Sequence, residues 1–168
     1  MKQKCPFILT IFSMILGVFI AVLFGVNEHL FKDKIKRDLG KNEKIMAIVD
    51  EGKRAVKLNA EASKNWRYYQ RFHFHSTGIA SMALGVLILL SFSMGTSALK
   101  LLASYMVSIG GFLYPFVWLF AALYGPIMGR SAAKESFAIF GYMGGVFLLG
   151  LLLSLFIIIK YPLKFARD

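Results

Sequence analysis

The sequence predicts an all-α integral membrane protein: a four-helix bundle with a short amphipathic helical segment between its first and second spans. Of the 168 residues, 57% are hydrophobic and only 17% are charged, against about 25% charged in soluble domains. Four long stretches contain no Asp, Glu, Lys or Arg, at 5–27, 72–99, 101–129 and 136–159. Apolar runs of about 20 residues cross a hydrocarbon core. The single cysteine, Cys5, excludes a disulfide scaffold.

The first span is predicted at 6–26. Lys2 and Lys4 precede its apolar run, as basic residues do in a signal peptide. The run is long for a signal peptide, and no small-residue cleavage site follows it. We therefore expect an uncleaved membrane anchor.

Residues 28–71 form the only sizeable polar segment, with twelve Lys/Arg and seven Asp/Glu. Phe31, Ile35 and Leu39 recur every four residues, which predicts an amphipathic helix that ends at Gly40. Gly52 is expected to end a second, short helical piece. No Gly or Pro follows between Lys53 and the second span, so one long helix is expected to run into the membrane. The segment is either a cap on the bundle or a docking surface for a partner.

The remaining spans are predicted at 73–95, 100–124 and 136–159, within a single membrane domain, 1–168. A turn-rich cluster at 91–97 predicts a tight hairpin between the second and third spans. Gly110, Gly111 and Pro115 predict a kink within the third span. Ser131 is expected to cap the fourth helix.

Small residues recur four apart on several spans, which favours close approach of helix backbones inside lipid. They are Gly17, Ala21 and Gly25 on the first span, Thr77, Ser81 and Gly85 on the second, and Gly141 and Gly145 on the fourth. The pattern fits contacts within a compact bundle and contacts between subunits equally well.

Four spans place the N- and C-termini on the same side of the membrane. The opposite side, called side B here, holds the polar segment together with Arg130 and Lys134, and so most of the Lys and Arg. The positive-inside rule then places side B in the cytoplasm, whereas the Lys-rich start favours the reverse orientation. The composition suits a bacterial inner (plasma) membrane. Anionic lipid headgroups are the expected partners of the net charge of +11, and no motif points to nucleic acid.

Few residues suggest chemistry. No ionisable side chain lies in the middle of a predicted span, which argues against an ion-coupled transporter. The sequence has no phosphate-binding loop, no zinc-protease motif and no nucleophile elbow. We therefore expect a protein that is not an enzyme.

Three histidines form the one candidate site. His29 follows the first span, and His73 and His75 open the second, so all three are expected near the side-B interface. Neutral imidazole binds haem iron, copper or zinc, so the three are candidate metal ligands and could hold a b-type haem. Arg71 and Arg130 would then bind its propionates. Because His73 and His75 are two residues apart on a helix, only one of them could pair with His29.

Other interpretations of the histidines remain open: a quinone headgroup site, or interface anchors that bind water, lipid or a backbone carbonyl. Three function classes follow. The first is a non-catalytic accessory or assembly subunit, as a homo-oligomer or with other membrane subunits. The second is a haem- or metal-binding electron-transfer protein. The third is a channel or carrier formed by an oligomer.

Overall fold

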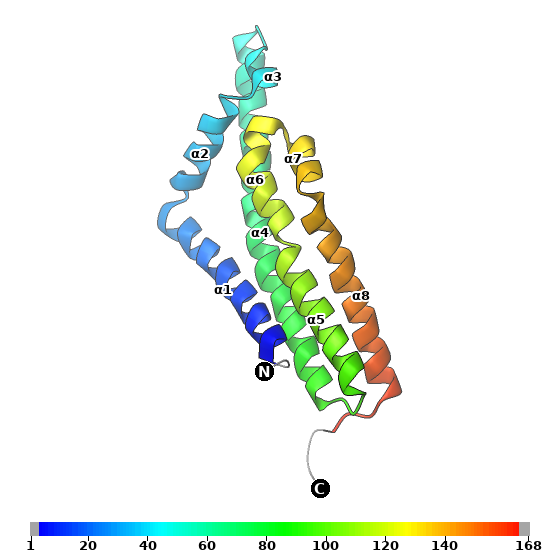
Figure 1. The fold of residues 1–168 in the computed structure, drawn as a ribbon. Helices are drawn as coiled ribbons and strands as arrows, with labels where there is room; N and C mark the ends of the chain where they lie inside the picture. Colours follow the sequence, from blue (N-terminus) through cyan, green and yellow to red (C-terminus); the bar gives the residue numbers. More distant parts are fainter. Residues whose placement is uncertain (1–3, 165–168) are drawn as a thin grey trace.

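A computed structural model describes residues 4–164, and the regular secondary structure of this part of the chain consists of helices joined by short connections, without strands (Figure 1). In order, the helices are α1 (Lys4–Asn27), α2 (His29–Leu39), α3 (Glu43–Met46), α4 (Glu51–Phe92), α5 (Ser97–Leu113), α6 (Phe116–Met128), α7 (Arg130–Ser136) and α8 (Ala138–Lys160). The all-α class predicted from the sequence is confirmed.

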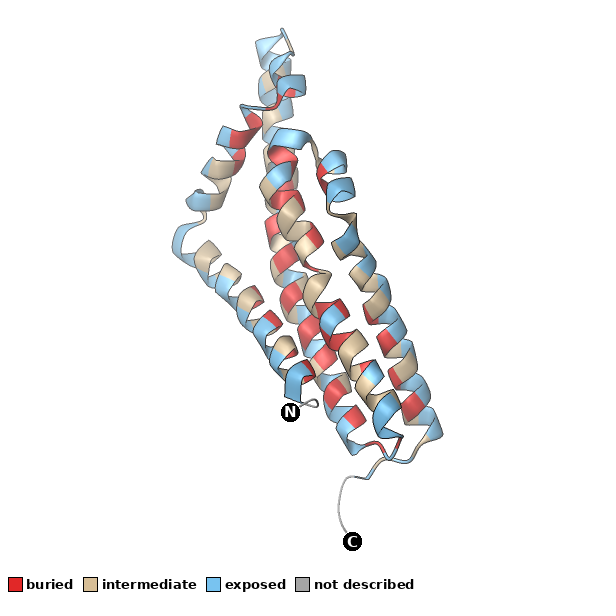
Figure 2. Ribbon diagram, in the orientation of Figure 1, coloured by how far each residue is buried: buried red, intermediate tan, exposed pale blue. Residues whose placement is uncertain are grey.

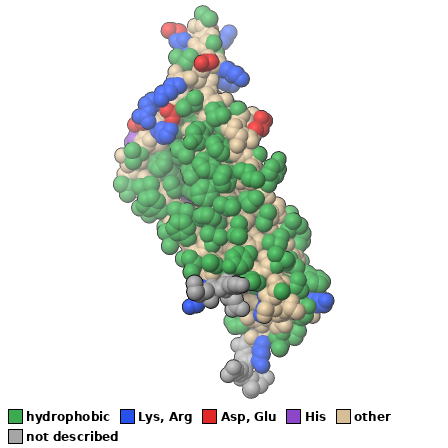
Figure 3. All heavy atoms as spheres, viewed as in Figure 1, with side chains coloured by type: hydrophobic (Ala, Val, Ile, Leu, Met, Phe, Trp, Pro, Cys, Tyr) green, Lys and Arg blue, Asp and Glu red, His purple; other side chains and the backbone are tan. Residues whose placement is uncertain are grey.

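Four helical segments are long and apolar enough to cross a membrane. They are α1, α4, α5 together with α6 (Ser97–Met128), and α8. The start of α1 and the end of α8 lie at the same end of the molecule (Figure 1). Apolar side chains cover the middle of the surface, and many charged ones gather at the opposite end (Figure 3). The four apolar helices predicted from the sequence are therefore present.

Helix α4 is one continuous helix of 42 residues, about 60 Å long, as the sequence predicts. Asp50 caps its start, because its side chain accepts a hydrogen bond from the Lys53 backbone N–H at 2.9 Å. Gly40 ends α2, as expected. The prediction that Gly52 ends a helix is wrong: with Asp50 as the cap, Gly52 becomes the second residue of α4. We call residues 51–71 of α4, which precede its apolar part, the stalk.

The third span bends where the sequence predicts. Helix α5 ends at Leu113 and α6 begins at Phe116, because Pro115 lacks the N–H that would continue the helix. A short polar helix, α7, precedes the fourth span, and the break between α7 and α8 lies at Phe137. Ser131 does not cap the fourth span, contrary to expectation. Gly129, with φ 90°, makes the turn before α7, so Ser131 already lies inside that helix.

Helix α4 is central, and its buried residues line the side that faces the other helices (Figure 2). Helices α5 and α8 pack at close range: a Cβ on Gly110 would lie 2.5 Å from the Phe147 nitrogen. Helix α1 meets α4 at Gly17, where a Cβ would lie 2.7 Å from Thr77 Cγ2. The predicted close packing is thus found at Gly17. It is not found at Gly25, Gly85 and Gly145, which have nothing within 4 Å of such a Cβ.

Candidate functional site

A partly buried polar cluster joins the stalk to the α6–α7 connection. The Arg130 guanidinium Nε donates a hydrogen bond to Glu61 Oε2 at 2.7 Å. The Glu61 side chain is 12% exposed and lies 3.3 Å from Lys64 Nζ through its other oxygen. One carboxylate therefore pairs with a cation on its own helix and with another from a distant part of the chain.

The charges of this cluster reinforce each other. Burial raises the pKa of Glu61, but the hydrogen bonds and charges of Arg130 and Lys64 outweigh it, so the pKa lies below its ordinary value of 4.5. The hydrogen bond to Glu61 in turn raises the pKa of Arg130. Both groups are therefore charged at neutral pH, and the pair holds α7 to the stalk.

Two asparagines complete the polar cluster. Asn65 is fully buried, and its Nδ2 donates to the Glu61 carbonyl at 2.8 Å. Its Oδ1 sits against Gly125, where a Cβ would lie 2.7 Å away. Asn42 Nδ2 donates to the carbonyls of Pro126 and Ile127, both at 3.0 Å. The α2–α3 connection and the end of α6 are thus tied together by side-chain amides.

Asn42, Glu61 and Asn65 are not among the candidate residues that the sequence predicts. The available signal was the spacing of Glu61, Asn65 and Tyr68, which places all three on one helix face. Among many charged and polar residues in the segment, that spacing does not single them out.

The two histidines of α4 lie against different helices. His73 Nδ1 is 2.8 Å from the Gly17 carbonyl of α1, whereas His75 Nδ1 is 2.8 Å from the Arg71 carbonyl of its own helix. The His75 ring packs near Trp118, with 5.8 Å between ring centroids. A carbonyl oxygen can only accept, so Nδ1 is the donor in both rings. The two rings therefore lie on different sides of α4, as the spacing of two residues on a helix requires.

His29 lies exposed at the start of α2. Within residues 4–164, no group of three or more His, Cys, Asp or Glu side chains is placed to hold a metal ion. A pair formed by His29 and His73, with the metal or haem it would carry, stays a prediction.

The two candidate arginines are engaged separately. Arg130 pairs with Glu61, as described. The Arg71 guanidinium lies over the Trp118 ring, 4.8 Å from its centroid, and near the Tyr68 ring, at 5.6 Å. Such stacking is a favourable place for an arginine at an interface. The binding of one ligand by Arg71 and Arg130 together stays a prediction.

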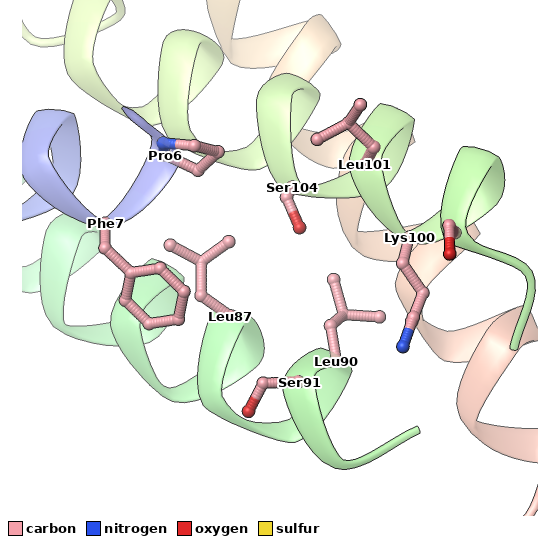
Figure 4. Close-up of a pocket in the computed structure, with 9 residues that line it drawn as sticks. Pro6, Phe7, Leu87, Leu90, Ser91, Lys100, Leu101 and Ser104 are labelled. Carbon is pink, nitrogen blue, oxygen red and sulfur yellow. The ribbon is translucent and has the colours of Figure 1, made fainter. Parts of the chain in front are cut away.

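Two hollows lie at opposite ends of the bundle. A small cavity of about 120 Å³ is formed by α1, α4 and α5 near the chain ends, and the Ser104 hydroxyl points into it (Figure 4). Lys100 borders the cavity, but its amine donates to the Ser93 carbonyl at 2.8 Å. A groove of about 640 Å³ runs between α2 and the stalk. We call it the α2–α4 groove. It is lined by Lys32, Ile35, Lys36, Asn59, Ala62, Ser63, Trp66, Arg67 and Gln70.

Comparison with protein-family models, with curated proteins and with solved structures finds no significant match to this chain.

Proposed function

We propose that this protein is a non-catalytic accessory or assembly subunit of a membrane complex, and that the stalk is its docking element. The observation that carries the proposal is the exposure of apolar side chains at the stalk tip, by which we mean the start of the stalk and the connection before it, residues 46–56. Val49 is 92% exposed, Val56 is 70% exposed and Met46 is 44% exposed.

These apolar side chains lie outside the reach of lipid tails. Val56 precedes Trp66 by ten residues, which corresponds to about 15 Å along the helix. Trp66 belongs to an aromatic group at the end of α1, 4.9 Å from the Phe24 ring. Lipid therefore does not account for the exposure of Val49 and Val56, whereas a protein surface would cover them.

The stalk is also braced, which suits a docking element. Ile35 and Leu39 of α2 are each 2% exposed and pack in a core cluster with Tyr68 and Tyr69 of α4. The polar cluster holds the same region to α6 and α7. A surface that is ordered before binding loses less conformational entropy when a partner docks.

Photo-crosslinking in native membranes tests the proposal. A benzophenone amino acid at Val49 or Val56 is expected to yield one discrete adduct with another protein. The same probe at Phe19, an exposed apolar position of α1, is expected to react with lipid alone. The double variant Val49→Asp, Val56→Asp should leave the chain in the membrane but release it from a larger complex on native gels. A chain that migrates as a monomer and forms no protein adduct at either tip position would refute the proposal.

An absorption spectrum of the purified chain separates this function from the haem alternative. We expect a colourless sample. A dithionite-reducible Soret band at one haem per chain, lost in His73→Ala or His29→Ala, would replace the accessory function with electron transfer.

We propose the bacterial inner membrane as the location, because short, strongly apolar chains with basic flanks insert there.

A further inference from the structure

The α2–α4 groove has a chemistry that docking through the stalk tip does not use. We propose that it binds the phosphate of an anionic phospholipid headgroup. The proposal rests on the charge of the groove, on its hydrogen-bond donors and on its level relative to the membrane. It is independent of the docking function.

Positive charge dominates the lining of the groove. Lys32 and Lys36 of α2 and Arg67 of α4 are its charged residues, and no carboxylate lines it. Lys32 Nζ is paired with Glu28 at 2.7 Å. Lys36 and Arg67 form no ion pair with any residue of the described part of the chain. Two uncompensated cations from two helices therefore border one hollow, and a phosphate would compensate them.

Neutral donors lie beside the cations. Asn59, Ser63 and Gln70 line the α4 side of the groove. The Ser63 hydroxyl donates to the Asn59 carbonyl at 3.0 Å. The side-chain amides of Asn59 and Gln70 form no hydrogen bond with residues 4–164. They are free to donate to phosphate oxygens or to hydroxyls of a headgroup such as glycerol.

The floor of the groove places it at headgroup level. Trp66, Ile35 and Ala62 supply apolar surface there, and Lys32 Nζ lies 5.6 Å from the Trp66 ring centroid. Arg67 and Gln70 of the groove precede Phe72, the first residue of the uncharged run, by five and two positions, about 8 Å and 3 Å along the helix. The headgroup layer occupies roughly 5–8 Å on each side of the hydrocarbon core. The end of the groove nearest the apolar run thus lies at the depth of a lipid phosphate, and Trp66 lies just beyond it, where interfacial aromatics are found.

Lipid binding by the full chain in detergent tests this site. Native mass spectrometry with equal amounts of phosphatidylglycerol and phosphatidylcholine is expected to detect one retained phosphatidylglycerol. Lys36→Gln with Arg67→Gln should weaken its binding about ten- to thirtyfold, on the scale of the attraction between basic residues and anionic lipid. The matched double variant Lys44→Gln, Lys53→Gln removes the same charge outside the groove and should bind as the wild type does. Equal binding by both double variants would overturn the proposal.

The same samples distinguish a lipid phosphate from a soluble phosphate as the ligand of the groove. Glycerol phosphate at millimolar concentration should not displace the lipid if the acyl chains hold it in place. Displacement by glycerol phosphate, with binding of glycerol phosphate to lipid-free protein, would assign the groove to a soluble phosphate and overturn the lipid assignment.

A fluorescence measurement tests the site without altering its charges. The chain has two tryptophans, Trp66 and Trp118, so the variant Trp118→Phe keeps Trp66 alone. Phosphatidylglycerol brominated high on its acyl chains should then quench Trp66 more strongly than brominated phosphatidylcholine. Equal quenching by the two lipids would contradict a preference of this groove for the anionic headgroup.

Discussion

At the scale of single residues, the polar cluster is the feature that a composition-based analysis overlooks. Asn65 and Glu61 lie in a segment crowded with polar side chains, and nothing in their own neighbourhood marks them as buried. The burial of Asn65 depends on Gly125, 60 residues away along the chain, and that of Glu61 depends on Arg130, 69 residues away. Long-range pairing of this kind leaves no local signal in the sequence.

Glu61→Gln is expected to lower the stability of the protein by about 1–2 kcal/mol, because it removes a charged partner of Arg130 and leaves a weaker hydrogen bond. Thermal unfolding in detergent measures the change. Glu51→Gln is the matched control: its side chain is 89% exposed, and it should unfold at the wild-type temperature. Identical melting of the two variants would contradict a structural role for the Glu61–Arg130 pair.

Acid should destabilise the protein through the same carboxylate. The pKa of Glu61 is lowered from 4.5 in the folded chain, so the unfolded chain binds its proton at a higher pH. The stabilisation is complete above about pH 5 and is lost as the pH falls through the lowered pKa. Melting temperatures measured between pH 7 and pH 3 should fall less steeply in Glu61→Gln than in the wild type. Parallel curves would exclude Glu61 as a source of the acid sensitivity.

At the scale of the elements, sequence pattern predicts most of the helices and misplaces some ends. The apolar runs locate the spans, and Pro115 locates the bend, since these effects are local. The ends around Gly52 and Ser131 depend on which neighbour supplies the cap. Asp50 caps α4, which begins at Glu51, one residue before Gly52. The positive φ of Gly129 makes the turn after which α7 begins at Arg130, one residue before Ser131.

Glycine spacing alone does not identify which helix faces touch. Gly110 and Gly145 lie on the two helices of the tightest pair, but only Gly110 meets a neighbouring backbone. Gly110→Ala should destabilise the protein by about 1–3 kcal/mol, because α5 and α8 would have to separate. Gly145→Ala should be neutral or slightly stabilising, since alanine is the better helix former. Thermal unfolding of the two variants measures the difference in stability. A Gly145→Ala variant that is as destabilised as Gly110→Ala would contradict the prediction.

At the scale of the whole molecule, the fold predicts two sets of accessible positions on opposite sides of a membrane. In a Cys5→Ser background, cysteine at Val56 and cysteine at Ser97 should react with a membrane-impermeant maleimide from opposite sides. Intact and permeabilised spheroplasts distinguish the two sides, and the result also decides whether side B faces the cytoplasm. Labelling of both positions from one side would contradict the four-span arrangement.

The global arrangement was predictable as a class but not in its details. Four apolar stretches predict a four-span helical protein, because lipid permits few other structures. The separation of His73 from His75 follows from helix geometry alone. The α2–α4 groove does not follow from the sequence, because it depends on how far the path of α2 diverges from that of α4.

Because α4 is unbroken, the stalk moves as one rigid body with the apolar part of the same helix. Its 21 residues, from Glu51 to Arg71, extend about 30 Å beyond the apolar part of the same helix. No hinge separates the two parts, so a change of about 10° in the tilt of the span moves the tip sideways by roughly 5 Å. Helix tilt responds to bilayer thickness. The position of Val56 relative to the membrane surface therefore depends on the thickness of the bilayer that the apolar part of α4 crosses.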